Sequence, residues 1–73
     1  GVHNIRVNSI APGLTNTDMM KKNHQEKIIN EMISRISLRR IANPEEIANV
    51  VLLLSSDLTS YITGQVIRVD GGM

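Results

Sequence analysis

The sequence predicts part of an α/β sheet whose elements follow in the order strand, helix, helix, strand. Two segments rich in β-branched residues, 2–10 and 65–69, are separated by about fifty residues with mainly helical patterns, and a tight hairpin cannot join strands so far apart. They therefore belong to a parallel or mixed sheet with helices packed on it. Two strands alone would leave sheet edges and a helix face in water, so we expect this chain to complete a larger sheet.

Composition limits the classes of function. The chain has 73 residues, 41% of them hydrophobic, and one aromatic residue, Tyr61, so its core is expected to be aliphatic. The lack of cysteine excludes disulfides and thiolate metal sites, and it is compatible with a cytoplasmic setting. His3 and His24 cannot form a metal site unaided. A net charge of +1 gives no field for nucleic acid or an anionic membrane. The longest apolar run, residues 50–54, is far shorter than the ~20 residues that cross a bilayer. Because the chain starts with Gly1 rather than Met, we expect a segment of a longer protein.

The first strand is expected to occupy about six of residues 2–10, because apolar and polar side chains alternate there. Pro12 should end it, since proline removes a donor from the ladder, and Gly13 should allow the positive φ of a sharp exit. Residues 14–23 are predicted to form a loop. Several of its side chains can cap a helix or turn the backbone: Thr15, Asn16, Thr17 and Asp18.

An amphipathic helix is predicted over residues 24–37. Its apolar residues recur at spacings of one, three and four: Ile28, Ile29, Met32, Ile33 and Ile36. A second helix should span residues 43–55, with Asn43 as the N-cap and Pro44 in the first turn. Its second half is apolar nearly all round, as in a helix that is covered on more than one side. A turn-rich connection then leads to the last strand, residues 65–69.

Four short motifs carry more specific information. The first is NSIAPG at residues 8–13 followed by TNTDM at 15–19. The other three are RRIANPEEIA at 39–48, YITGQ at 61–65 and VDGG at 69–72. In this order and spacing they resemble the C-terminal part of a short-chain dehydrogenase/reductase, closest to the branch typified by 3-oxoacyl-[acyl-carrier-protein] reductases. Each motif is weak alone, but together they cover nearly the whole chain.

The resemblance implies the C-terminal portion of a Rossmann-type doubly wound parallel sheet, with residues 1–73 as the C-terminal segment of a single NAD(P)-binding domain that is incomplete by itself. It implies NADP or NAD as the cofactor. It also implies that the loop after the first strand holds the nicotinamide, through Pro12, Gly13, Leu14, Thr15 and Thr17. In similar enzymes the main chain around Leu14 and Thr15 bonds the carboxamide, and the Thr17 hydroxyl reaches the carboxamide or the pyrophosphate. The residues alone leave a second interpretation open, in which Pro-Gly only ends a strand and the threonines cap the next helix.

The resemblance further implies a substrate lid over residues 19–37, whose adjacent Met19 and Met20 suit an adaptable apolar wall. The alternative is that both methionines pack as ordinary core. Residues 43–55 and 65–69 match a helix and a strand that pack across twofold axes in related enzymes to build homotetramers. Alternatively, the apolar helix is buried within its own subunit.

The family's catalytic serine, tyrosine and lysine have no counterpart here, since Tyr61 is followed four positions later by Gln65. The glycine-rich turn that receives the pyrophosphate is also missing, because Gly71 and Gly72 follow a strand with no helix behind them. We therefore expect no catalytic residue in these 73 residues, which the resemblance implies are part of an NAD(P)-dependent oxidoreductase.

That enzyme is expected to transfer a hydride between the nicotinamide cofactor and a small-molecule carbonyl or alcohol substrate, with a 3-oxoacyl thioester as the first candidate. The remainder of the same domain and further copies of the protein are the expected partners. The alternative is a truncated, non-catalytic α/β interaction module. A nucleic-acid binder is disfavoured by the net charge of +1 and the single aromatic residue.

Overall fold

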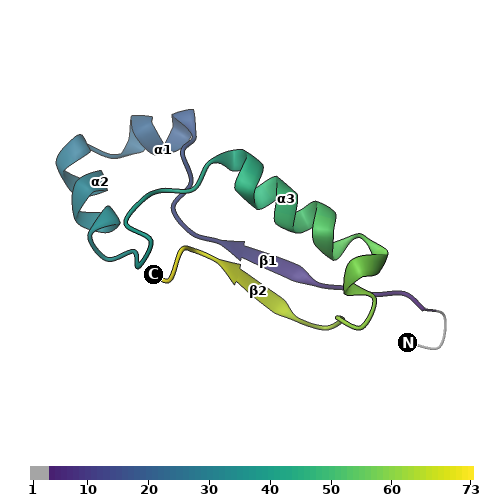
Figure 1. Ribbon diagram of the computed structural model, residues 1–73. Coiled ribbons are helices and arrows are strands. Elements are labelled where there is room, and N and C mark those ends of the chain that lie inside the picture. Colours follow the sequence, from purple (N-terminus) through teal and green to yellow (C-terminus); the bar gives the residue numbers. More distant parts are fainter. Residues whose placement is uncertain (1–3) are drawn as a thin grey trace.

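The computed structural model describes residues 4–73. Its elements, in chain order, are β1 (Ser9–Pro12), α1 (Asp18–Asn23), α2 (Glu26–Ile33), α3 (Pro44–Leu54), the 3₁₀ helix η1 (Asp57–Thr59) and β2 (Val66–Val69). Figure 1 shows α3 alongside the two strands and places α1 and α2 beyond the strands' carboxyl ends. The described residues therefore follow the predicted α/β order, with one α-helix and one short 3₁₀ helix more than the sequence predicted.

The two strands pair in parallel, as predicted. Ser9 lies opposite Val66 and Pro12 lies opposite Val69. Parallel strands need a long crossover connection, which the three helices provide. Because both strands run in the same direction, the segments that leave Pro12 and Val69 start side by side at one end of the sheet (Figure 1).

The bounds of β1 differ from the prediction. Residues 2 and 3 lie outside the described part of the chain, and residues 4–8 are not in a strand, because β2 begins only at Val66, opposite Ser9. The strand also runs through Pro12 instead of ending before it. The N–H groups of Ser9 and Gly13 both donate to the β2 side of the sheet, each at 2.9 Å. Since amides alternate in direction along a strand, the nitrogen of Pro12 faces away from β2, and no ladder bond is lost.

The segment predicted as a loop contains a helix, and the long helix predicted after it is shorter. Thr17 is the N-cap of α1, where its hydroxyl accepts a hydrogen bond from the N–H of Met20 at 3.1 Å. The ring Nδ1 of His24 lies 3.0 Å from the carbonyl oxygen of Met20 and closes the other end. In α2 the predicted helix stops at Ile33, and tighter turns follow, with Arg39 at a φ of 58°. A six-residue helix is too short to show an apolar period, which is why its pattern reads as a loop.

The start of α3 is as predicted. Asn43 precedes the helix and Pro44 occupies its first turn. The N–H of Asn43 donates to Oε1 of Glu46 at 3.0 Å, so the side chain of the third helical residue satisfies a donor at the helix start. The helix ends at Leu54, one residue before the predicted end.

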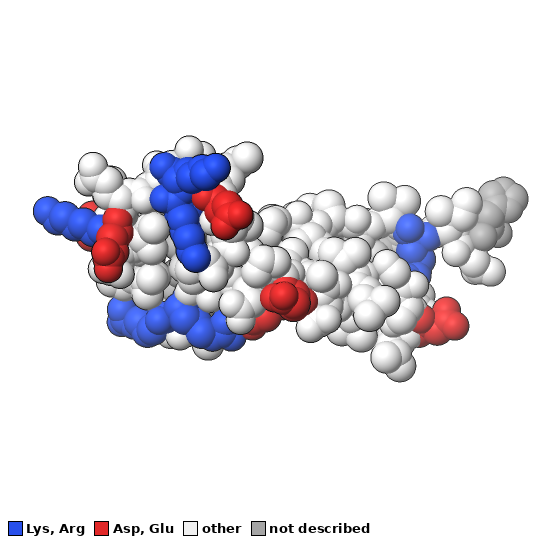
Figure 2. Space-filling model, turned by 90° about the horizontal axis from the view of Figure 1, so that it is seen from above, with Lys and Arg blue, Asp and Glu red and all other residues white. Residues whose placement is uncertain are grey.

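Little apolar surface is buried within residues 4–73. The buried apolar side chains there are Met20, 8% exposed, and Ile36, 2% exposed. Along α3, the side chains of Val51, Leu52 and Leu53 are all exposed, Leu52 by 71%. Figure 2 shows that Lys, Arg, Asp and Glu gather at the end formed by α1 and α2, whereas the surface over α3 carries few charges. The described chain therefore leaves an apolar helix face without cover.

Over the part of the chain that the structure describes, no helix is long and apolar enough to cross a bilayer. The same residues contain no group of three or more histidine, cysteine, aspartate or glutamate side chains that could hold a metal ion.

Arg6 joins the chain before β1 to the turns that follow α3. Its Nη1 donates to the carbonyl oxygens of Thr59 at 2.8 Å and Ile62 at 3.1 Å, and its Nη2 donates to those of Leu54 at 3.0 Å and Ser56 at 3.1 Å. These carbonyls lie at the C-terminal ends of α3 and η1, where helical partners run out and the helix dipole is negative. One guanidinium therefore fixes the crossover's return to β2.

Arg6→Ala should lower the free energy of unfolding by about 2 to 4 kcal/mol, because it leaves several part-buried carbonyl oxygens without their donor. Urea unfolding of the protein that contains this chain measures the change. Arg6→Lys should recover only part of it, since an ammonium lacks the planar fork of donors. The matched control is Arg35→Ala, since the guanidinium of Arg35 is exposed and has no hydrogen bond within residues 4–73; its cost should stay below about 0.5 kcal/mol. Equal losses in the Arg6 and Arg35 variants would contradict the assignment.

Candidate functional site

The loop after β1 is tied to the chain that leads into α3. The N–H of Gly13 donates to the carbonyl oxygen of Val69 at 2.9 Å. Ala42 then forms hydrogen bonds with the two sequence neighbours of Thr15. The N–H of Ala42 donates to the carbonyl of Leu14 at 3.0 Å, and its carbonyl accepts from the N–H of Asn16 at 2.8 Å. This is an isolated parallel bridge between Thr15 and Ala42. The backbone of the loop is therefore held in one conformation without regular secondary structure.

The same bridge leaves the main chain of Thr15 free. In a parallel bridge the residue between the two bonded neighbours directs its own N–H and C=O to the opposite side. Within residues 4–73 neither of these two groups of Thr15 has a hydrogen-bond partner. Its hydroxyl donates instead to the carbonyl of Gly13 at 3.0 Å. The loop thus presents one donor and one acceptor from a single, immobilised residue.

A shallow pocket of about 330 Å³ lies between this loop and α1. Its lining residues are Gly13, Leu14, Thr15, Thr17, Met19, Met20, Asn23 and His24. Four of the five predicted cofactor residues are brought together here; the fifth, Pro12, is the last residue of β1 and does not line the pocket. The site is open on one side, as expected for a surface that a further part of a protein or a ligand covers.

The two methionines of the predicted lid take different positions. Met20 is buried, and Met19 is 72% exposed. The alternative in which both pack as ordinary core is therefore right for Met20 and wrong for Met19. Met19 lines the pocket with most of its side chain open to solvent, which gives the pocket an apolar, conformationally adaptable edge.

Sequence reasoning did not place Asn23 and His24 at the site. Both come from the end of α1, which was predicted as a loop. The pattern that could have revealed them is the threonine N-cap at Thr17, since a helix that starts there puts Met20 and His24 on one face, four residues apart. The sequence predicts Asn16 only as a capping residue. In the structure its side-chain Oδ1 is buried and has no hydrogen-bond partner among the described residues.

Gly13 is needed for a different reason from the predicted one. Its φ is not positive; the glycines with positive φ among the described residues are Gly64, Gly71 and Gly72. A Cβ at Gly13 would lie 2.7 Å from the Cβ of Asp70 and 2.8 Å from its Cα. The two chain segments that leave β1 and β2 approach so closely that no side chain fits between them.

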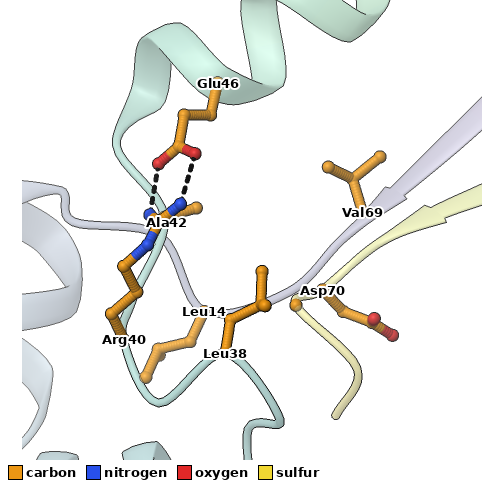
Figure 3. A pocket seen from close by; sticks show the side chains of 8 residues that line it. Leu14, Leu38, Arg40, Ala42, Glu46, Val69 and Asp70 are labelled. Atoms are coloured by element: carbon orange, nitrogen blue, oxygen red, sulfur yellow. Dashed lines mark hydrogen bonds and ion pairs between the residues drawn. The ribbon is translucent and has the colours of Figure 1, made fainter.

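A second, smaller cavity of about 100 Å³ lies behind the loop, between Leu14, Leu38 and the start of α3 (Figure 3). One wall is the ion pair of Arg40 and Glu46, in which Nη1 contacts Oε1 at 2.6 Å and Nη2 contacts Oε2 at 2.8 Å. Figure 3 shows the carboxylate of Asp70 pointing away from this pair. The hydrogen bonds from Arg40 and from the N–H of Asn43 lower the pKa of Glu46 to about 2. The pair fixes residue 40 to α3, and with it the neighbouring Ala42 that holds the loop.

The single tyrosine lies far from this site. Tyr61 follows η1, near the start of β2 and therefore at the opposite end of the sheet, and its side chain is fully exposed. Tyr61 therefore lies outside the pocket beside Thr15. What the described residues offer is a binding surface.

Comparison with known proteins gives one family. Residues 1–73 match the family model described as enoyl-(acyl carrier protein) reductase. A 3-oxoacyl-[acyl-carrier-protein] reductase FabG from Chlamydia trachomatis is 53% identical over 73 residues, which is 100% of this chain and 29% of that protein. A 3alpha-hydroxysteroid dehydrogenase from Mediterraneibacter gnavus is 49% identical over 71 residues, 97% of this chain and 28% of that protein.

A solved structure gives the same result for the fold. The crystal structure of a 3-oxoacyl-[acyl-carrier protein] reductase with bound NAD from Brucella melitensis superimposes with a TM-score of 0.86 at 33% identity, covering 99% of this chain and 25% of that one. The likeness confirms the predicted fold class, a portion of a Rossmann-type parallel sheet. This chain spans less than a third of the length of each of these proteins.

Stability should depend on acid pH through Glu46. Its pKa in the folded protein, about 2, lies below its ordinary value of 4.5, so its ion pair stabilises the fold fully above about pH 4.5, and this contribution is lost as the pH falls towards 2. The stability advantage of the unmodified protein over Glu46→Gln should therefore shrink as the pH falls from about 6 to about 3. This range includes the ordinary pKa of a glutamate. Urea unfolding at each pH measures it.

The control for this prediction is Glu45→Gln. Glu45 lies beside Glu46 in the first turn of α3, but its carboxylate has no hydrogen bond within residues 4–73. The effect of Glu45→Gln on the free energy of unfolding should therefore change much less over the same pH range. If the Glu46→Gln difference is as large at pH 3 as at pH 6, the ion pair does not lower the pKa as described.

Proposed function

Because the chain belongs to the short-chain dehydrogenase/reductase family, we propose that it forms the C-terminal segment of one NAD(P)-binding Rossmann domain in an oxidoreductase. That enzyme transfers a hydride between NAD or NADP and a small-molecule carbonyl or alcohol. A 3-oxoacyl thioester is the first substrate candidate, because proteins named for that activity are among the relatives over the whole chain. A cytoplasmic setting remains a prediction from the cysteine-free composition.

One observation carries the proposal. The unpaired N–H and C=O of Thr15 lie in a rigid loop at the carboxyl end of parallel strands, where Rossmann-type sheets bind their ligands. A nicotinamide carboxamide carries one acceptor and one donor in a plane, so it complements this pair. The carbonyl of Leu14 already accepts one hydrogen bond from Ala42, whereas the carbonyl of Thr15 has both lone pairs free within residues 4–73, so we assign the main acceptor role to Thr15.

The other proposed cofactor residues support that contact. Pro12 and Gly13 set the exit of the loop from β1, and Gly13 allows its approach to Asp70. Leu14 and Thr17 line the pocket. The Thr17 hydroxyl accepts from Met20 and keeps its proton, so it can still donate to a carboxamide oxygen or a phosphate. Thus capping of α1 and cofactor binding are compatible in one side chain.

When bound, the nicotinamide supplies the hydride at its C4. The chain's own contribution is to hold the ring: a fixed donor and acceptor at Thr15 restrict rotation of the carboxamide, and rigid positioning lowers the barrier for transfer. The apolar side chains of Leu14 and Met19 would exclude water from the exposed side of the ring.

The lid and the oligomer are proposed on the same basis. Residues 19–37 begin at the pocket and are largely exposed, which suits a segment that closes over a substrate. The exposed apolar face of α3 and the exposed side chain of Val66 support packing against further copies of the protein in a homotetramer. The same face would support a non-catalytic interaction module, which the assay below distinguishes.

The full-length protein should oxidise NADPH or NADH when supplied with an acetoacetyl thioester. Its kcat/KM for the thioester should exceed that for a 3-ketosteroid, which represents the activity named for the other relative. Loss of the reduced cofactor's absorbance measures both rates. A faster rate with the ketosteroid would change the substrate class and keep the reaction. If neither cofactor binds and no substrate is reduced, the interaction module is the better description.

Thr17→Val should weaken the cofactor site. It removes a hydroxyl that caps α1 and that we assign to the cofactor, so kcat/KM for the cofactor should fall by the equivalent of about 0.5 to 1.5 kcal/mol. Thr17→Ser keeps the hydroxyl and should retain nearly full activity. Steady-state kinetics with varied cofactor measures both variants. Unchanged kinetics in Thr17→Val would count against the assignment of this side chain.

A further inference from the structure

The residues after β2 bond to the turn that ends the α2 segment. The N–H of Leu38 donates to the carbonyl of Gly71 at 3.0 Å, and the hydroxyl of Ser37 donates to the carbonyl of Gly72 at 2.9 Å. We call residues 36–38 together with residues 70–72 the clasp. It joins the end of the proposed substrate lid to the end of the sheet, across more than thirty positions of sequence.

The clasp requires glycine on one side. Gly71 and Gly72 have φ values of 64° and 85°, which other residues rarely adopt. A Cβ at Gly71 would lie 2.8 Å from Cγ2 of Ile36, and a Cβ at Gly72 would lie 2.7 Å from Cβ and Oγ of Ser37. Ile36 is the most deeply buried apolar side chain of the described chain, so it has little room to move away.

The clasp is also tied to the cofactor loop. The carboxylate of Asp70 accepts from the N–H of Gly72 at 3.0 Å and pairs with Arg68 at 2.7 Å, which fixes the glycine turn. On its other side Asp70 lies against Gly13, at the start of the loop that lines the pocket. Residues 70–72 therefore contact both the start of the cofactor loop and the end of the lid.

The lid itself has few other attachments. No residue of α2 is buried, and in α1 only Met20 is buried. One end of the lid is set by Thr17, which belongs to the loop, and the other by the turn at residues 36–38. Because so little of the lid is packed between these ends, the position of the turn at residues 36–38 determines the orientation of the lid relative to the pocket.

We propose that Gly71 is a positioning residue that, through Ile36, sets the closure of the lid at residues 19–37 over the pocket beside Thr15. This inference rests on the proposed function, since it assumes that the lid covers a substrate. It does not involve the contacts of the nicotinamide. Neither Gly71 nor Ile36 lines the pocket proposed for the nicotinamide, so a defect in their contact should weaken substrate binding more than cofactor binding.

The test is Gly71→Ala in the full-length protein. The added Cβ displaces Ile36 and loosens the end of the lid, so the KM for the carbonyl substrate should rise about tenfold, a factor typical of losing a well-packed contact. The turnover at saturating substrate should change by less than about twofold, since uniform binding is what is lost. The cofactor's Kd should change much less than this KM, because Gly71 and Ile36 do not line the nicotinamide pocket. Amides of α1 and α2 should exchange their hydrogens faster, while those of α3 should not.

The chain offers a matched control and a rescue. Gly64 has a similar φ of 70°, but nothing lies within 4 Å of the Cβ that alanine would add. Gly64→Ala therefore imposes the same backbone strain without the clash, and it should leave KM and the exchange of the lid unchanged. Ile36→Leu removes the Cγ2 branch that the new Cβ would meet. Combined with Gly71→Ala, Ile36→Leu should return KM to within about threefold of the unmodified protein. The difference that remains is due to backbone strain at residue 71.

Two results would overturn the inference. One is an unchanged KM and lid exchange in Gly71→Ala; the other is an equal loss in Gly71→Ala and Gly64→Ala, which would indicate general destabilisation. Failure of the proposed function is separate. A protein that reduces no carbonyl would contradict that proposal, whereas hydrogen exchange in α1 and α2 would still show whether Gly71 holds the lid.

Discussion

The parallel pairing of β1 with β2 is the constraint on which the rest of the structure depends. Its register brings Pro12 opposite Val69, so the loop and the terminal glycine turn leave the sheet from adjacent positions. That proximity explains why Gly13 cannot carry a side chain and why Asp70 contacts the loop. A shift by one residue would exchange the faces of β2 and separate these contacts. The candidate site therefore exists only because two distant segments share one register.

Arg6 has the corresponding role at the other end of the sheet. By binding carbonyls at the ends of α3 and η1, it determines where the chain turns back into β2 and so where Val66 meets Ser9. These part-buried carbonyls need a hydrogen-bond donor, and one charged group satisfies several of them. A single side chain far from the pocket thus helps to set the register that forms the pocket.

The sequence predicted the parts of the fold that local chemistry determines. Asn43, Pro44 and the glutamates after them identify the start of α3, and the separation of the strands identifies parallel pairing. The extension of β1 through Pro12 could not be predicted, because it depends on which side of the strand faces a partner. The local signal of α1 is a single cap at Thr17, which by itself does not distinguish a helix from a turn. At the site, the loop residues came from a family resemblance, whereas the free main chain of Thr15 follows from its bridge to Ala42, a contact between distant residues.

The exposed apolar surface indicates what the site needs from its surroundings. Within residues 4–73 only Met20 and Ile36 are buried apolar side chains, and both belong to the proposed lid. Burial of apolar surface is the main force that offsets the entropy of ordering a chain, so α3 and the outer sides of the strands need a further apolar surface to pack against. The rigidity of Thr15 depends on Ala42, which precedes α3, and on Gly13, which follows β1. Cover over α3 and β1 would therefore act directly on the loop after β1, so under the proposed function such packing and nicotinamide binding should be coupled.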